Sequence, residues 1–233
     1  DCVTGIVGAS LRPQYINSLK LQATQIKRPF YEQPKPASAE YSGFKQWVYD
    51  LSPDLIWVNQ YSMHIKEEIL SIPRLGGINI HGGLLPQYRG CNSIQWSILN
   101  NEKKIGVTLH EMTCGIDEGN IIDEEAVPLF FEDTWKRAAA RLSEAREVLV
   151  KRNINSILSH SWKSTPQNNK NANYFKRRKR QDGLFSWEQP ALEIYNLIRA
   201  LVFPLPGAFY INERGKEVVI GDYCSLDKII SLK

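Results

Sequence analysis

The chain of 233 residues carries a formal net charge of +4 at pH 7, with 42% hydrophobic and 23% charged residues. This is the composition of an ordinary globular protein, long enough for a domain with a substantial core plus an appendage. No run approaches the roughly 20 apolar residues of a membrane helix and no secretory signal precedes the fold, so we expect a cytoplasmic protein without membrane attachment. The mild charge allows an anionic substrate without requiring nucleic acid. No metal-ligand spacing is present, and we expect reduced thiols at Cys2, Cys91, Cys114 and Cys224.

The N-terminal part of the chain alternates between strand and helix patterns. A helix is predicted from Phe44 to Leu51, because Phe44, Trp47 and Val48 share one face with Leu51, and Ser52-Pro53 ends it. The other predicted elements are a buried strand at 2–9, a weak helix at 11–25 interrupted by Pro13, a short strand at 27–34, a central strand at 54–60 and a short helix at 66–70.

The most informative stretch begins at Gly77 and holds two polar residues one position apart. Asn79 and His81 flank one apolar residue of a β-prone run, so strand alternation points both side chains to the same side of the sheet edge. Glycines and a proline then interrupt regular structure, and Tyr88-Arg89-Gly90 closes a loop that brings a cation beside the pair.

An acidic turn follows the next helix and strand. We predict a helix at 92–99 and a strand at 105–112, which runs into the turn-rich segment from Thr113 to Gly119. Asp117 lies in that turn. Asn, His and Asp are thus expected at strand ends, where open α/β sheets place their active sites.

The C-terminal part is predicted as an edge strand, a long helix and a small appended unit. Asp133-Thr134 can cap the long helix. The expected elements are the edge strand at 119–129, the helix at 135–158, a polar linker at 161–173, a basic run at 176–180, a helix at 190–201 and a hairpin of 208–211 with 217–220.

Three separated segments together resemble the 10-formyltetrahydrofolate-dependent formyltransferase family. They are Asn79 to Gly90, the strand Gly106-Val107-Thr108-Leu109-His110, and the turn Asp117-Glu118-Gly119. The members it is most similar to are the methionyl-tRNA and nucleotide-sugar amine formyltransferases. The resemblance implies an α/β fold with a Rossmann-like, mostly parallel twisted sheet and a short C-terminal α+β appendage. We expect a catalytic domain at 1–160, a linker at 161–173 and a small helix and hairpin subdomain at 174–233.

The resemblance assigns the family's catalytic trio to Asn79, His81 and Asp117. An amine that attacks a formyl carbon develops negative charge on the formyl oxygen, which the Asn79 amide can stabilise. His81 would act as the acid. Asp117 would favour its protonated imidazole and could accept a proton from the attacking ammonium. Each residue alone could equally be structural.

The resemblance also implies binding residues for two substrates. Backbone groups of the donor loop would meet the folate, although Met63 and Ile65 could instead be ordinary core residues. Expected donor-binding residues are Met63, His64, Ile65, Thr113, Cys114, Gly115 and Ile116. Expected acceptor-binding residues are Tyr88, Arg89, Gly90, Asn92, Gln95, Tyr174, Lys176 and Arg177, whereas Cys91 stands where some sugar-modifying relatives have an arginine. His64 and His110 are more often structural than catalytic.

The N-terminus departs from the family pattern. A first strand and helix that the family usually carries are missing before residue 2, a βα unit takes about 30 residues, and the chain begins with Asp1. We therefore expect an N-terminal truncation, the alternative being that other residues refill that place.

The function expected from the sequence is formyl transfer from 10-formyltetrahydrofolate to a nucleotide-linked aminodeoxy sugar, of the dTDP type, feeding a surface polysaccharide such as lipopolysaccharide O-antigen. One alternative is formylation of methionyl-tRNA, although that enzyme carries a full β-barrel where this tail has little more than a hairpin. Another is a truncated, non-catalytic binding module. The basic run could bind RNA, hold a pyrophosphate or form a solvated strip. Tail hairpins in this family often pair subunits, so a homodimer is expected.

Overall fold

The computed structural model describes residues 2–9 and 13–233, which form two compact units that are each discontinuous in sequence. The first unit contains residues up to 81, 109–122 and 154–166, and the second contains residues 82–108, 123–153 and 167–233. None of the described helices is long and apolar enough to cross a membrane.

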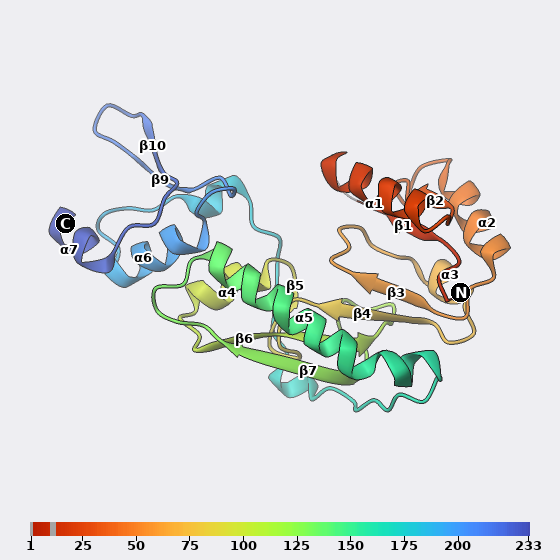
Figure 1. Cartoon of the computed structure of the whole chain (residues 1–233). Helices are drawn as coiled ribbons and strands as arrows, with labels where there is room; N and C mark the ends of the chain where they lie inside the picture. Colours follow the sequence, from red (N-terminus) through yellow and green to blue (C-terminus); the bar gives the residue numbers. More distant parts are fainter. Residues whose placement is uncertain (1, 10–12) are drawn as a thin grey trace. The chain divides into compact units, whose positions relative to one another are not determined.

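The first unit opens with a parallel βαβ arrangement. Strand β1 (Ile6–Gly8) pairs with β2 (Phe30–Glu32), and helix α1 (Pro13–Gln25) connects them (Figure 1). The helix starts at Pro13, where a missing N–H costs nothing because first-turn amides have no helical partner. Residues 11 and 12, the start of the helix predicted at 11–25, lie outside the described residues.

Helix α2 (Tyr41–Leu51) supplies one side of the first unit's core. Phe44 and Val48 are 2% and 5% exposed, and they belong to a buried cluster with Tyr41, Val58, Ile65, Ile69 and Leu70. The helix ends at Ser52, whose φ of 44° is left-handed and whose N–H donates to the Tyr49 carbonyl. Pro53 follows and cannot continue a helix, so the predicted stop is confirmed.

The main sheet has four strands, in the order β3 (Ile56–Asn59), β4 (Gly77–His81), β6 (Lys104–Glu111) and β7 (Ile121–Pro128). Strand β3 is parallel to β4, with Ile56 opposite Gly77, and α3 (Glu67–Leu70) lies between them in the chain. The Met112 amide, just beyond β6, donates to the Gly77 carbonyl at 2.8 Å, and His110 lies opposite Asn79. Since residue numbers fall along β6 as they rise along β4, these two strands are antiparallel. The predicted α/β class is confirmed, with a mixed sheet.

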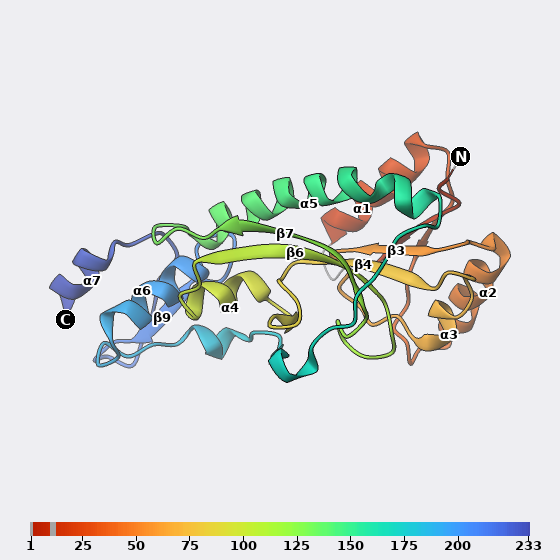
Figure 2. The same ribbon diagram turned by 90° about the horizontal axis from the view of Figure 1, so that it is seen from below.

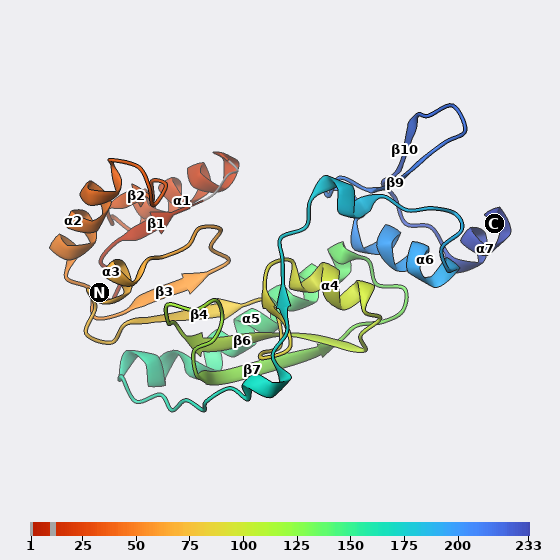
Figure 3. The same ribbon diagram turned by 180° about the vertical axis from the view of Figure 1, so that it is seen from behind.

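The second unit is built from helices and short strand pairs. Helix α5 (Trp135–Leu158) lies along β7 (Ile121–Pro128), where Arg152 donates to Asp123 at 2.6 Å and to Glu125 at 2.7 Å (Figure 2). The hairpin of β9 (Ala208–Ile211) and β10 (Glu217–Ile220) extends away from α6 (Ala191–Ala200) (Figure 3). The remaining elements are β5 (Arg89–Gly90), β8 (Tyr174–Phe175), α4 (Ser93–Leu99), α7 (Leu226–Leu232) and 3-10 turns at Asn169–Asn171 and Arg180–Gly183.

A buried guanidinium holds α6 to its neighbours in the second unit. Arg199 is 1% exposed and donates to the Asp133 carbonyl and to Asn196 Oδ1, both at 2.9 Å. Burial lowers the pKa of Arg199 because the charged form loses its hydration. These hydrogen bonds offset that cost and fix α6 against the loop before α5.

The polar segment at 161–173 makes defined hydrogen bonds with other parts of the chain. Thr165 and Ile121 exchange two backbone hydrogen bonds of 2.8 Å. Gln167 and Asn169 accept hydrogen bonds from Arg89. The predicted domain boundaries themselves stay a prediction.

Phe44→Ala should lower the free energy of unfolding by about 3–5 kcal/mol, because it removes a nearly fully buried ring and leaves a cavity. The matched control is Tyr49→Ala on the same helix, where the ring is 67% exposed and the change should stay within about 0.5 kcal/mol. Urea unfolding of both variants measures the difference. Equal destabilisation by the two substitutions would show that burial of the Phe44 ring does not stabilise this core.

Candidate active site

Strand β4 places two polar side chains on one side of the sheet. Ile78 and Ile80 are 0% and 3% exposed and anchor the strand in the core. Alternation then turns Asn79 and His81 together to the opposite side. His81 is 8% exposed, so its imidazole sits in a largely dehydrated place.

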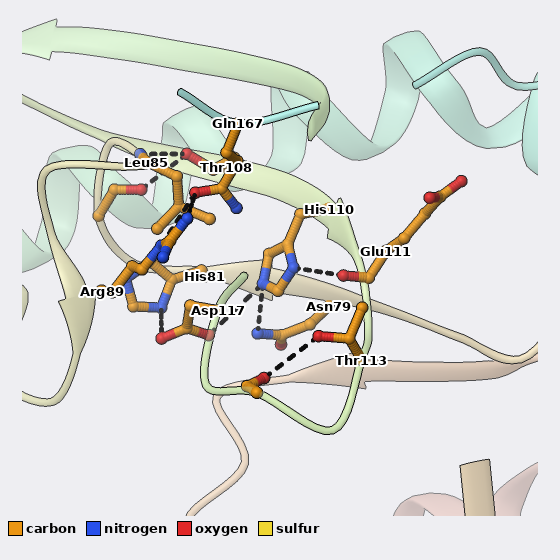
Figure 4. Close-up of polar contacts among 12 residues, drawn as sticks. Asn79, His81, Leu85, Arg89, Thr108, His110, Glu111, Thr113, Asp117 and Gln167 are labelled. Carbon is orange, nitrogen blue, oxygen red and sulfur yellow. Dashed lines mark hydrogen bonds and ion pairs between the residues drawn. The ribbon is translucent and has the colours of Figure 1, made fainter. Parts of the chain in front are cut away.

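The carboxylate of Asp117 lies between the imidazoles of His81 and His110. Its Oδ2 lies 3.4 Å from His81 Nδ1, and its Oδ1 lies 3.5 Å from His110 Nε2 (Figure 4). The two rings are nearly perpendicular, with centroids 6.4 Å apart. The structure therefore brings together the three side chains predicted as catalytic and adds His110 to them.

Hydrogen bonds around His110 define the proton on its ring. Nδ1 is 2.7 Å from the Glu111 carbonyl, which can only accept, so Nδ1 carries a hydrogen. Nε2 lies within reach of both Asn79 Nδ2, at 3.1 Å, and Asp117 Oδ1, at 3.5 Å. In the neutral ring Nε2 accepts from Asn79, whereas only a protonated ring would donate to the Asp117 carboxylate. One amide hydrogen of Asn79 is directed at His110, and the second remains for another acceptor.

The turn that carries Asp117 folds tightly back onto the end of β6. Asp117 has a φ of 54°, the left-handed conformation that Asp and Asn tolerate best after glycine. Gly119 has no substitute here, because a Cβ would lie 1.8 Å from the Glu111 carbonyl oxygen. This is the carbonyl that contacts His110, so the tight approach links the Asp117 turn to the orientation of His110. Trp162 and Ser164 donate to the Glu111 carboxylate at 3.2 and 2.9 Å and hold this end of the strand.

The predicted donor residues lie on two loops of the first unit. In the loop after β3, Ile65 packs in the core while His64 is exposed. No backbone–backbone hydrogen bond within the described residues involves Met63 or Ile65. In the loop after β6, Cys114 is exposed and Ile116 is 58% exposed. Thr113 Oγ1 lies 3.5 Å from the Gly115 carbonyl. Both loops therefore offer accessible groups, and their role stays a prediction.

The predicted acceptor residues gather in the second unit. Arg89 is 2% exposed and donates to Gln167, to Asn169 and to the Tyr174 hydroxyl at 2.6–3.0 Å. Gly90, with a φ of 95°, pairs with Phe175 so closely that a Cβ would lie 2.3 Å from its carbonyl oxygen. These contacts use Arg89 to fix the segment that carries Tyr174.

Aromatic rings extend this contact between the two predicted acceptor segments. The Phe175 ring stacks on Tyr88 at 5.0 Å and contacts Trp96 at 5.2 Å. Burial and the Glu102 carboxylate raise the pKa of Tyr88 to about 12, so its hydroxyl stays protonated. Asn92 accepts from the Arg178 amide at 2.9 Å, and Gln95 is 6% exposed. Tyr174, Lys176 and Arg177 are exposed beside them.

His110 and Glu111 are the site residues that the sequence did not assign. A histidine at the end of a predicted strand was the available signal. The closeness of His110 to Asn79 depends on β6 lying beside β4, and strand order is not readable from one sequence.

Among the described residues, no group of three or more His, Cys, Asp or Glu side chains could hold a metal ion.

Comparison with known proteins gives the family. Residues 11–154 match the formyl transferase family, and residues 177–228 match the formyl transferase C-terminal domain. The chain is 36% identical over 195 residues to the bifunctional polymyxin resistance protein ArnA of Wigglesworthia glossinidia brevipalpis, covering 84% of this chain but only 29% of that protein.

Solved structures share the fold. A 4-N formyltransferase from Francisella tularensis superposes with a TM-score of 0.70 at 20% identity, covering 97% of this chain and 99% of that one. An N-formyltransferase from Helicobacter canadensis, in complex with folinic acid and dTDP-3-aminofucose, gives 0.64 at 23% identity and covers 91% and 85%. With a family match over more than half of its length, the chain belongs to the formyl transferase family.

Proposed function

We propose that the chain transfers a formyl group from 10-formyltetrahydrofolate to the amine of a nucleotide-linked aminodeoxy sugar. The observation that carries this proposal is the Asp117 carboxylate between His81 and His110, with the Asn79 amide bound to His110. Support for the substrate pair comes from the Helicobacter canadensis structure, which holds folinic acid and a dTDP-amino sugar. A dTDP sugar for a surface polysaccharide, a homodimer and a cytoplasmic setting are parts of the same proposal.

Formamide formation needs stabilisation of the negative formyl oxygen and transfer of protons, and residues of the site can provide both. The second amide hydrogen of Asn79 can stabilise the formyl oxygen as it becomes negative, which is effective in a site with little water. His81 donates a proton to the departing folate nitrogen. Asp117, which faces His81 Nδ1, orients that imidazole and accepts a proton from the attacking ammonium. His110 acts through Asn79 by fixing the direction of its amide.

The loops after β3 and β6 fit a folate donor. A pterin ring presents donors and acceptors along its edge, and the Met63 and Ile65 backbone groups have no backbone partner among the described residues. Ile116 offers an apolar side chain that is 58% exposed on the Asp117 loop. The donor supplies an activated formyl group, and these residues would hold and orient it.

The basic run favours a small anionic acceptor over RNA. Arg178 lies over Trp96 and bonds the Asp182 carbonyl, and Arg180 lies over Phe209 and pairs with Glu217. These two cations serve the packing of the second unit. Lys176 and Arg177 stay exposed, and two cations suit a pyrophosphate.

A mass-spectrometric screen tests the proposal. The chain is incubated with 10-formyltetrahydrofolate and a panel of amino-sugar nucleotides, and in parallel with methionyl-tRNA. A mass gain of one formyl group on a nucleotide sugar is expected. Formylation of the tRNA alone would support the second family activity instead. No product and no folate binding would show that the chain is not a formyltransferase and would leave the non-catalytic alternative.

His81→Asn should lower kcat by about 10²–10⁴-fold, because the site loses its proton donor, while the affinity for the sugar nucleotide changes little. The control is His160→Asn, which removes an exposed imidazole of the first unit. Steady-state kinetics and nucleotide titration measure both quantities. Activity within a few-fold of the wild type would show that the acid is another group.

Asp117→Asn should lower kcat by about 10²-fold or more without unfolding the chain. Asn keeps the shape and tolerates the left-handed backbone at this position, but it cannot accept the proton. Glu118→Gln removes the adjacent carboxylate and serves as the matched control. If both variants lose the same activity, the charge of the turn matters rather than the contact with the histidines.

A further inference from the structure

A buried amide from another part of the first unit contacts the loop that follows β3. Gln33 is 4% exposed, and its side chain contacts the loop at two points. The Tyr61 hydroxyl donates to Gln33 Oε1 at 2.6 Å, and Gln33 Nε2 donates to the His64 carbonyl at 3.2 Å. One side chain therefore fixes both ends of the segment 61–64.

Gln33 itself is anchored at the end of the first strand pair. It directly follows β2, and its backbone N–H donates to the Gly8 carbonyl at 2.9 Å. On the loop side, Ser62 Oγ donates to the Ala9 carbonyl, which adds a second contact with the end of β1. The position of the loop is thus set by the β1–β2 pair.

The two contacts of Gln33 require a side chain that both accepts and donates, as an amide does. The Tyr61 hydroxyl donates and the His64 carbonyl accepts, so the bridging group must accept at one atom and donate at another. Burial raises the pKa of Tyr61 and keeps its hydroxyl a donor. A glutamate of the same length could accept from Tyr61, but its carboxylate could not donate to the carbonyl of His64.

The geometry points to Gln33 as a positioning residue for binding of the formyl donor. By engaging the His64 carbonyl, it orients the loop and leaves the backbone groups of Met63 and Ile65 for the pterin edge. A loop ordered before binding loses less entropy when the ligand arrives, which favours affinity. This inference rests on the proposed function and assigns a role to a residue that does not contact the reacting atoms.

The test compares donor affinity with acceptor affinity. Gln33→Leu removes both hydrogen bonds, and we expect the KM for 10-formyltetrahydrofolate and the Kd for folinic acid, measured by calorimetry, to rise about five- to tenfold. The kcat at saturating donor and the KM for the sugar nucleotide should change less than twofold. Gln46→Leu, an exposed glutamine on α2, is the matched control.

Two further variants separate positioning from general stability. Tyr61→Phe removes the hydrogen bond to Gln33 and should also raise the donor KM. The double variant should raise the donor KM by less than the product of the two single effects, because both changes remove the same hydrogen bond. Gln33→Glu should also raise it, since the bond to His64 is lost. If Gln33→Leu lowers stability in urea but leaves donor and acceptor KM values unchanged, Gln33 is only structural and the inference is overturned. A wild-type chain that neither binds folinic acid nor transfers formyl overturns the proposed function, and this inference with it.

Discussion

The site depends on one carboxylate that two imidazoles share. Asp117 can contact both His81 and His110 only if its turn folds back over the end of β6, and the left-handed φ at Asp117 is part of that path. The missing side chain of Gly119 allows the turn to touch the Glu111 carbonyl. The same carbonyl binds His110, so backbone packing, imidazole orientation and carboxylate position form one constraint.

Strand direction explains how residues from distant segments reach this carboxylate. The parallel partner β3 sends its following loop past the end at which His81 lies, while the antiparallel partner β6 brings His110 opposite Asn79. In a parallel pairing, His110, near the end of β6, would lie at the His81 end of β4 rather than opposite Asn79. The antiparallel pairing therefore lets a residue of the neighbouring strand orient the Asn79 amide.

The sequence predicts local features well and spatial neighbours poorly. The alternation of Asn79 and His81, the long helix that ends at Leu158 and both strands of the hairpin at 208–211 and 217–220 follow from residue patterns. His110 could not be assigned because its partners depend on strand order. The polar composition of 161–173 predicts a linker, but composition does not reveal that Gln167 and Asn169 accept hydrogen bonds from a buried arginine. Helix α7 was not predicted at all.

Buried cations change what the net charge of +4 means for binding. Arg89 and Arg199 are 2% and 1% exposed, and their guanidinium groups hydrogen-bond side chains and carbonyls of the second unit. A buried charge left without such partners would cost several kcal/mol, so these arginines are committed to holding the unit together. Lys176 and Arg177, by contrast, are exposed cations of the same unit. Arg89 thus fixes Tyr174 and the segment that carries Lys176 and Arg177, and its own contact with an acceptor stays a prediction.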